Sequence, residues 1–195
     1  MNELAPRPGD ALIIVDVQND FLPGGSLAVP DGDAVIAPLN RYAALFAKDR
    51  HPVFATRDWH PREHCSFKAR GGPWPPHCVA GSRGAEFPVA LAIPQAAAVI
   101  SKATEPGRDA YSGFEGTDLQ RQLRAKGIRR VFVAGLATDY CVLATVKDAL
   151  ARGLEAVVLA DAVRAVDAAP GDGARALREM RARGATLAQY QDVVP

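Results

Sequence analysis

Several apolar segments of this 195-residue chain each end near a side chain that could do chemistry. Asp16 lies at the end of the first apolar run, Lys102 closes a later one, and Cys141 follows another run that ends at Gly135. A carboxylate can move a proton, a cation can stabilise a negative charge, and a thiol can attack an electrophilic carbon. We therefore predict Asp16, Lys102 and Cys141 as a catalytic base, cation and nucleophile.

Each of these residues also has an ordinary structural explanation. An Asp after a strand often caps a loop, a single Lys is usually solvated, and a free Cys is usually a small buried hydrophobe. With Thr138 as N-cap, Cys141 would be the third residue of a helix, where the helix dipole lowers a thiol pKa. Position alone leaves the reactive and the structural interpretation of Cys141 open.

A second group of residues could bind a metal ion. Asp58 and His60 are two residues apart at the end of a predicted strand, so their side chains point to the same side. His77 follows a stiff Trp-Pro-Pro segment that could hold a third ligand. Two imidazoles and one carboxylate with open coordination positions suit Zn²⁺, Fe²⁺ or Mn²⁺. The alternative is three polar loop residues without a metal.

The pairs His64-Cys65 and His77-Cys78 suggest a competing interpretation, a structural zinc site with two Cys and two His ligands. We do not favour it, because neighbouring residues in an extended chain point in opposite directions. Both members of each pair would therefore seldom reach one ion.

The composition is that of an ordinary globular protein, with 48% apolar residues, 23% charged residues and a net charge of +1. Without a basic block, nothing favours nucleic acid or an anionic membrane as a partner. We find no apolar run of membrane-spanning length and no signal-peptide pattern, and three cysteines cannot all pair within one chain. We therefore expect a cytoplasmic protein that acts on a small molecule, and a homo-oligomer remains open.

Short apolar runs alternate with amphipathic helical patterns, which predicts a parallel sheet covered by helices on both faces. The predicted strands are residues 11–17, 52–57, 98–102, 130–135, 154–160 and 185–188. The predicted helices are residues 33–48 (regular from about Pro38), 117–126, 138–152 and 172–183. We expect an α/β fold, a three-layer αβα sandwich around a mostly parallel, roughly six-stranded sheet, with residues 1–195 in one domain.

The segment from residue 60 to residue 94 is rich in Pro and Gly and has little periodicity. A loop of that length in a compact domain is usually functional. In open parallel sheets, ligands bind beyond the carboxyl ends of the strands, and every early strand delivers a reactive group to that edge. This convergence is stronger evidence than any single residue. Together with Asp58, His60 and His77, the long irregular segment predicts a metal-binding loop region at about residues 58–94.

Five segments together carry a resemblance to a known family. They are DVQNDF at 16–21 with PGGSL at 23–27, RDWHP at 57–61, WPPHC at 74–78, Lys102 with YSGF at 111–114, and GLATDYCV at 135–142. With these segments in this order, the chain resembles the nicotinamidase/pyrazinamidase branch of the isochorismatase-like cysteine hydrolases. The resemblance extends over about residues 11–188.

The resemblance implies the hydrolysis of nicotinamide to nicotinate and ammonia in NAD salvage, with pyrazinamide as a further substrate. It implies one divalent metal ion, with Zn²⁺ as the first choice and Fe²⁺ or Mn²⁺ as alternatives. By this resemblance the catalytic residues are Asp16, Lys102 and Cys141, the metal ligands are Asp58, His60 and His77, and the substrate pocket is lined by Phe21, Leu27, Trp74, Ala137 and Tyr140.

The resemblance also has implications for the backbone around Cys141. It implies a cis peptide bond between Leu136 and Ala137 and an oxyanion hole formed by the N–H groups of Ala137 and Cys141. Some family members use a further side chain from this loop near the metal ion, which would be His64 here, and we leave His64 outside the predicted ligand set. We expect Asp20 to organise its Gly-rich loop and Asp161 to be a solvated or capping residue.

Three other functions remain as alternatives. A hydrolase of the same fold for an N-carbamoyl amide, a ureido compound or isochorismate would share the catalytic segments, although isochorismatases lack the Asp-His-His set. A metallohydrolase would use a metal-bound hydroxide and keep Cys141 as a structural residue. A non-catalytic binding module is the third alternative, because a fold does not fix a function.

Overall fold

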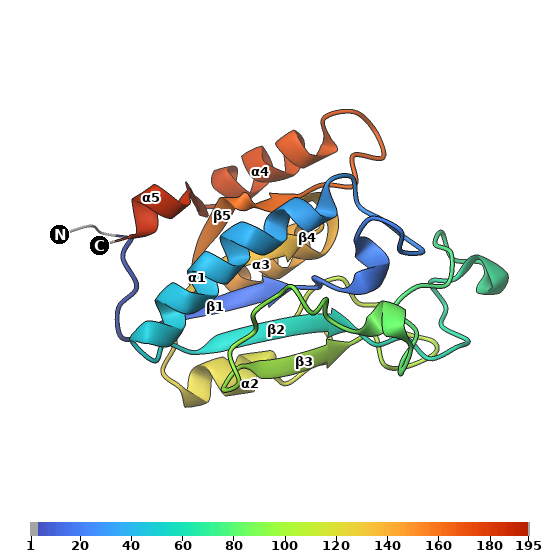
Figure 1. The fold of residues 1–195 in the computed structure, drawn as a ribbon, viewed down its shortest axis with the longest axis horizontal. Helices are drawn as coiled ribbons and strands as arrows, with labels where there is room; N and C mark the ends of the chain where they lie inside the picture. Colours follow the sequence, from blue (N-terminus) through green and yellow to red (C-terminus); the bar gives the residue numbers. More distant parts are fainter. Residues whose placement is uncertain (1–3, 195) are drawn as a thin grey trace.

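The computed structural model describes residues 4–194, so residues 1–3 and 195 of the predicted domain lie outside the described part. Within this part, six strands form one sheet in the order β3-β2-β1-β4-β5-β6, and all neighbouring strands are parallel (Figure 1). The strands are β1 (Asp10–Val15), β2 (Val53–Asp58), β3 (Ala98–Lys102), β4 (Arg130–Leu136), β5 (Glu155–Arg164) and β6 (Thr186–Ala188). The predicted parallel sheet is confirmed.

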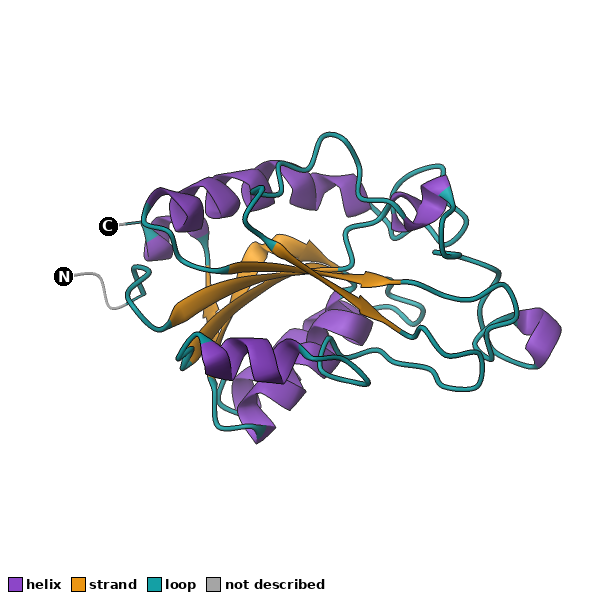
Figure 2. Cartoon of the chain, turned by 90° about the horizontal axis from the view of Figure 1, so that it is seen from below, coloured by secondary structure: helices purple, strands orange, loops and turns teal. Residues whose placement is uncertain are grey.

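Helices cover both faces of the sheet, as Figure 2 shows. The helices are α1 (Ile36–Lys48), α2 (Leu119–Ala125), α3 (Leu143–Ala151), α4 (Asp172–Ala182) and α5 (Tyr190–Val193). α1 packs against β1, β2 and β5, whereas α3 packs against β4, β5 and α4. The predicted αβα sandwich is therefore confirmed. Among the described residues, none of the helices has the length and apolar character needed to cross a bilayer.

Several element boundaries differ from the prediction. α1 begins at Ile36 rather than near Pro38, because a proline in the first helical turn loses no hydrogen bond. β5 continues to Arg164, beyond the predicted end at residue 160. Short elements without a readable period were missed. They are α5 and the 3₁₀ turns Asn19–Phe21, Gly32–Val35, Lys68–Arg70 and Arg83–Ala85.

Gly135 lets β1 and β4 approach each other closely where both strands end. Its φ is +119°, and a Cβ at this position would lie 2.1 Å from the carbonyl oxygen of Val15. A larger residue would therefore push the two strand ends apart. Asp16 directly follows Val15, and residues 137–142, which we call the nucleophile turn, begin two residues after Gly135. This glycine thus brings two predicted catalytic segments together.

Asp161 has a structural role on the α1 face of the molecule. Its carboxylate accepts a 2.8 Å hydrogen bond from the Tyr42 hydroxyl and a 3.2 Å hydrogen bond from the Tyr190 backbone N–H. Tyr190 is the first residue of α5, and its ring packs edge-on against Tyr42. Asp161 therefore ties α5 to α1, which agrees with the capping role predicted for it.

A buried ion pair joins the starts of β1 and β4. The Arg130 guanidinium donates to both carboxylate oxygens of Asp10, at 2.6 Å and 3.1 Å, and both residues are at most 5% exposed. Removing one partner of such a pair leaves a buried charge uncompensated. We expect Asp10→Ala to lower the free energy of unfolding by about 3–5 kcal/mol, measured by urea unfolding with circular dichroism.

The matched control for Asp10→Ala is Arg121→Ala. Arg121 pairs with Asp118 on the surface, and its side chain is 78% exposed. Exposed pairs contribute about 0–1 kcal/mol, so the control should unfold almost like the wild type. Equal stabilities of the Asp10 and Arg121 variants would contradict the prediction.

Candidate active site

The predicted catalytic residues meet at the carboxyl edge of the sheet. Asp16 follows β1, Asp58 ends β2 and Lys102 ends β3, where it is the register partner of Asp58. Cys141 lies in the nucleophile turn after β4. These four side chains come from four different strand ends, and all are buried. The structure thus produces the convergence that the order of strands and reactive residues predicted.

Lys102 is at the centre of the cluster. Its Nζ donates to Asp58 Oδ1 at 2.5 Å, to the Ala110 carbonyl at 3.0 Å and to Cys141 Sγ at 3.5 Å, and it lies 3.0 Å from Asp16 Oδ2. Burial alone would lower the pKa of Lys102, but the carboxylates of Asp16 and Asp58 raise it well above its ordinary value. The side chain therefore remains an ammonium ion beside the thiol.

Burial raises the pKa values of both Asp16 and Cys141. The pKa of Asp16 is raised by burial although Lys102 opposes the shift, and Thr56 Oγ1 donates to Asp16 Oδ1 at 2.6 Å. The pKa of the Cys141 thiol is raised well above its ordinary value by burial, with Lys102 again opposing and Asp16 adding to the rise. The predicted lowering of the thiol pKa is therefore wrong. Burial favours the protonated form of both Cys141 and Asp16, and the Lys102 ammonium opposes this effect in each.

The nucleophile turn also differs from the predicted start of a helix. The predicted helix at residues 138–152 is divided into a π-helical turn, Thr138–Val142, and α3, which begins at Leu143. Ala137 rather than Thr138 precedes the turn, so Cys141 is not the third residue of a regular α-helix. The Leu136–Ala137 peptide bond is cis, as the resemblance implied. Single π-helical turns occur often at functional sites.

Asp58, His60 and His77 form a compact set of donor atoms. One ligand atom from each lies within 4.8 Å of the others, and all three residues are buried. His77 Nδ1 lies 2.8 Å from the Pro75 carbonyl. A carbonyl can only accept, so this nitrogen carries the proton and Nε2 keeps its lone pair. Burial lowers the pKa of His77, which favours the neutral imidazole that a metal ion requires.

The remaining atoms of this set also fit a metal ion. His60 Nδ1 is buried and has no hydrogen-bond partner among the described residues. The Lys102 ammonium donates a hydrogen bond to Asp58 Oδ1, whereas Asp58 Oδ2 lies 3.6 Å from His60 Nε2. Burial alone would raise the pKa of Asp58, but the Lys102 ammonium and the interactions with His60 together hold this pKa well below its usual range. A carboxylate and two imidazoles suit a divalent ion such as Zn²⁺.

His64 lies beside the metal-ligand set but is engaged elsewhere. Its Nδ1 is 2.7 Å from Ser66 Oγ, and its Nε2 is 3.0 Å from the Arg108 carbonyl. Its ring packs against His60 with 4.2 Å between ring centroids. Both nitrogens are therefore used by hydrogen bonds, which supports leaving His64 outside the ligand set.

The alternative zinc site with two Cys and two His ligands is not formed by the described residues. Their metal-compatible clusters contain neither Cys65 nor Cys78. Burial raises the pKa of the Cys78 thiol far above its ordinary value, which disfavours the thiolate that a metal ion would bind.

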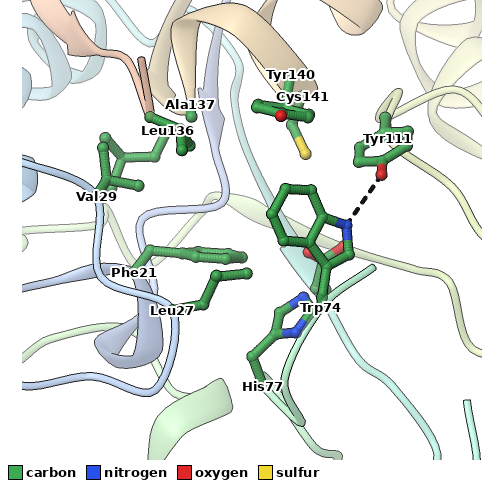
Figure 3. Close-up of a pocket in the computed structure, with 12 residues that line it drawn as sticks. Phe21, Leu27, Val29, Trp74, His77, Tyr111, Leu136, Ala137, Tyr140 and Cys141 are labelled. Carbon is green, nitrogen blue, oxygen red and sulfur yellow. Dashed lines mark hydrogen bonds between the residues drawn. The ribbon is translucent and has the colours of Figure 1, made fainter. Parts of the chain in front are cut away.

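A pocket with about 420 Å³ of space, part of it open solvent, is lined by Cys141 and by Asp58 and His77 of the candidate metal-ligand set. Figure 3 shows Cys141 and His77 facing into it from opposite ends. The structure places all five predicted substrate residues in its wall, namely Phe21, Leu27, Trp74, Ala137 and Tyr140. Trp74 packs edge-on against Tyr140, with 5.3 Å between ring centroids. The mainly apolar wall suits a small planar molecule.

The sequence did not predict four further wall residues, which are Val29, Tyr111, Leu136 and Val166. Tyr111 lies in the YSGF segment, and its hydroxyl accepts a 3.0 Å hydrogen bond from Trp74 Nε1. The position of Tyr111 in that segment was the signal that could have identified it as a pocket residue. No local pattern indicated Val166, which lies two residues after the end of the unexpectedly long β5. Asp139 in the nucleophile turn holds it there by accepting from its N–H at 2.9 Å.

Comparisons with known proteins agree with this geometry. The family model for the isochorismatase domain matches residues 10–192. The nicotinamidase of Escherichia coli is 40% identical, with 95% of this chain and 97% of that protein covered. A pyrazinamidase of Pyrococcus horikoshii in complex with zinc has 52% identity and a TM-score of 0.90, with 94% and 100% covered. PnC1 from L. infantum in complex with nicotinate has 39% identity and a TM-score of 0.89, with 97% of both chains covered.

Proposed function

The chain belongs to the isochorismatase family, and from this premise we propose that it is a nicotinamidase, a metal-dependent cysteine hydrolase that converts nicotinamide and water to nicotinate and ammonia. The same activity would deamidate pyrazinamide. One observation carries the proposal: Cys141 lines the same small apolar pocket as Asp58 and His77, two members of the Asp58-His60-His77 set. A pyridine ring with a carboxamide substituent can approach both the thiol and the metal-ligand residues, because its ring nitrogen and its carboxamide carbon are at different positions on the edge of the ring.

We propose Asp16, Lys102 and Cys141 as the residues that carry the reaction. Asp16 accepts the thiol proton, Lys102 stabilises the negative charge, and the Cys141 sulfur attacks the carboxamide carbon. The N–H groups of Ala137 and Cys141 would hold the developing oxyanion. Asp16 then returns the proton to the leaving ammonia, and a thioester remains on Cys141. Water, deprotonated by Asp16, hydrolyses this thioester to nicotinate and the free thiol.

The other end of the pocket orients the ring. Asp58, His60 and His77 would hold a divalent metal ion, with Zn²⁺ as the first choice. When bound, the ion supplies a Lewis-acidic contact for the pyridine nitrogen or for a water beside it. Phe21 and Trp74 would hold the ring faces by apolar contact. Positioning of this kind contributes to the rate because the carboxamide carbon is then held near the sulfur.

The direct test is ammonia release from nicotinamide before and after metal removal. We expect turnover by the zinc-loaded protein, a loss of about 100-fold in kcat/KM after chelation, and recovery when Zn²⁺ is added back. An absence of ammonia release from the zinc-loaded protein would eliminate nicotinamide as the substrate. N-carbamoyl and ureido amides would then be assayed, because enzymes for those substrates would share the catalytic segments.

The wider setting of the enzyme is also part of the proposal. We propose that residues 1–195 act as one domain with a metal-binding loop region at about residues 58–94, supported by one sheet and one continuous core. We propose a cytoplasmic location, supported by three free cysteines, which a reducing compartment would keep as thiols. The proposed role in NAD salvage rests on nicotinamide as the proposed substrate. The net charge of +1 supports a small molecule rather than nucleic acid or a membrane as partner.

A further inference from the structure

Asp20 is the chain neighbour of the pocket residue Phe21, but it does not line the pocket, and its carboxylate binds two other loops. Asp20 Oδ2 accepts a 2.7 Å hydrogen bond from the backbone N–H of Cys78, and Oδ1 accepts a 3.2 Å hydrogen bond from the N–H of Ser26. The hydrogen bond from Ser26 agrees with the predicted organisation of the Gly-rich loop. The hydrogen bond from Cys78 connects Asp20 to the residue that follows His77.

The Cys78 N–H belongs to the peptide group that joins His77 to Cys78. Asp20 therefore restrains the backbone of a predicted metal ligand directly. The carbonyl of Cys78 accepts a 3.0 Å hydrogen bond from the His60 N–H, so the same residue also connects to the second imidazole ligand. Cys78 has φ = +44°, a conformation that a non-glycine residue adopts only when its surroundings hold it there.

A third segment closes over the carboxylate. A Cβ on Gly84 would lie within 2.1–2.4 Å of the carboxylate atoms of Asp20, so only glycine fits against this group. Asn19 fixes the same segment, because its side chain donates to the Arg83 carbonyl at 2.8 Å and its backbone N–H to the Glu86 carbonyl at 2.9 Å. The Asp20 carboxylate is thereby held in one place between the three loops.

We propose that Asp20 is a positioning residue for the metal site, which sets the affinity for the metal ion by fixing the His77–Cys78 peptide group. This inference rests on the proposed function for the identity of the ligands. Asp20 has both carboxylate oxygens committed to backbone N–H groups of loops that carry Leu27 and His77. It therefore couples one wall of the substrate pocket to the position of an imidazole ligand without touching either the metal ion or the substrate.

The test is the Zn²⁺ affinity of Asp20→Asn, measured by competition with a chromophoric chelator. Asn has nearly the same shape, but it presents an NH₂ group to one of the two backbone N–H donors, so one hydrogen bond must break. We expect the dissociation constant for Zn²⁺ to rise about 10–100-fold. We also expect kcat to recover towards the wild-type value when Zn²⁺ is raised to saturation, which general damage to the fold would not allow.

Asp139→Asn is the matched control. Asp139 also accepts from two backbone N–H groups, those of Val166 and Asp167, and among the described residues its carboxylate has no hydrogen bond to the segments of Asp58, His60 or His77. Its variant should bind Zn²⁺ like the wild type. An unchanged Zn²⁺ affinity of Asp20→Asn, or an equal loss in both variants, would overturn the inference. Failure of the wild-type protein to bind Zn²⁺ would instead overturn the proposed metal site, so the two failures are distinguishable.

Gly84→Ala is a second variant that tests the same inference if Asp20→Asn does not fold. Gly84→Ala leaves the carboxylate in place but pushes against it, so it should displace Asp20 from the Cys78 N–H. A raised dissociation constant for Zn²⁺ in Gly84→Ala would support the inference. A wild-type constant in this variant would contradict it.

Discussion

Cys141→Ala is expected to lower kcat for ammonia release from nicotinamide by roughly 10⁴-fold or more. The reason is that the proposed mechanism forms a thioester on this sulfur, and no other thiol borders the pocket among the described residues. Removal of the sulfur leaves Asp16 and Lys102 without a group to activate. The measurement is a coupled ammonia assay on the zinc-loaded variant, with Zn²⁺ content and folding checked in parallel.

Cys65→Ala provides the control for this prediction. It is the same chemical change at a half-buried thiol that lies outside the pocket, and its kcat should match that of the wild type. Cys141→Ala should retain Zn²⁺, because the proposed metal ligands Asp58, His60 and His77 are on other segments. Near-normal turnover by Cys141→Ala would instead favour a metallohydrolase with a metal-derived nucleophile, which alkylation of the thiol would also leave active.

The convergence of the site could be predicted because it depends on an edge of the sheet rather than on atomic detail. In a parallel sheet all carboxyl ends lie on one side, so Asp16, Asp58 and Lys102 had to approach one another once their strands were recognised. The spacing of Asp58 and His60 similarly indicated a shared direction. The hydrophobic periodicity and the recognition of the strands were therefore sufficient to predict that these side chains lie close together.

The electrostatics of the thiol could not be predicted in the same way. The argument from Thr138 used a local rule for helix starts, whereas the observed π-helical turn and the burial of Cys141 depend on packing against other strands. Burial is a property of the whole fold, and here it outweighs Lys102 and raises the thiol pKa. Val166 was missed for a related reason, because the length of β5 depends on its pairing with β4.

Lys102 links the catalytic residues to the metal-ligand set. Its ammonium contacts the proposed base Asp16 and also Asp58, whose other carboxylate oxygen is on the side of His60. A single buried cation thus balances two carboxylates with different proposed roles. The position of the proposed base and the position of one proposed metal ligand are therefore coupled through one side chain.

This coupling leads to the second prediction of large effect, for Lys102→Met. Met keeps the approximate length of the side chain but removes the charge, so two buried carboxylates lose their common cation. We expect kcat to fall by about 10³-fold, because the thiolate and the oxyanion lose electrostatic stabilisation. We expect the free energy of unfolding of the metal-free protein to fall by about 3–5 kcal/mol, because removing one partner leaves buried charge unpaired.

Lys147→Met separates this effect from the general loss of a lysine. Lys147 pairs with Glu179 at 3.3 Å on the surface, with both side chains about 40% exposed. Its replacement should change the free energy of unfolding by about 0–1 kcal/mol and leave kcat unchanged. If Lys102→Met lost stability but retained kcat, the lysine would be only a structural counter-ion. A parallel loss of both quantities is what its shared contacts with Asp16, Asp58 and Cys141 require.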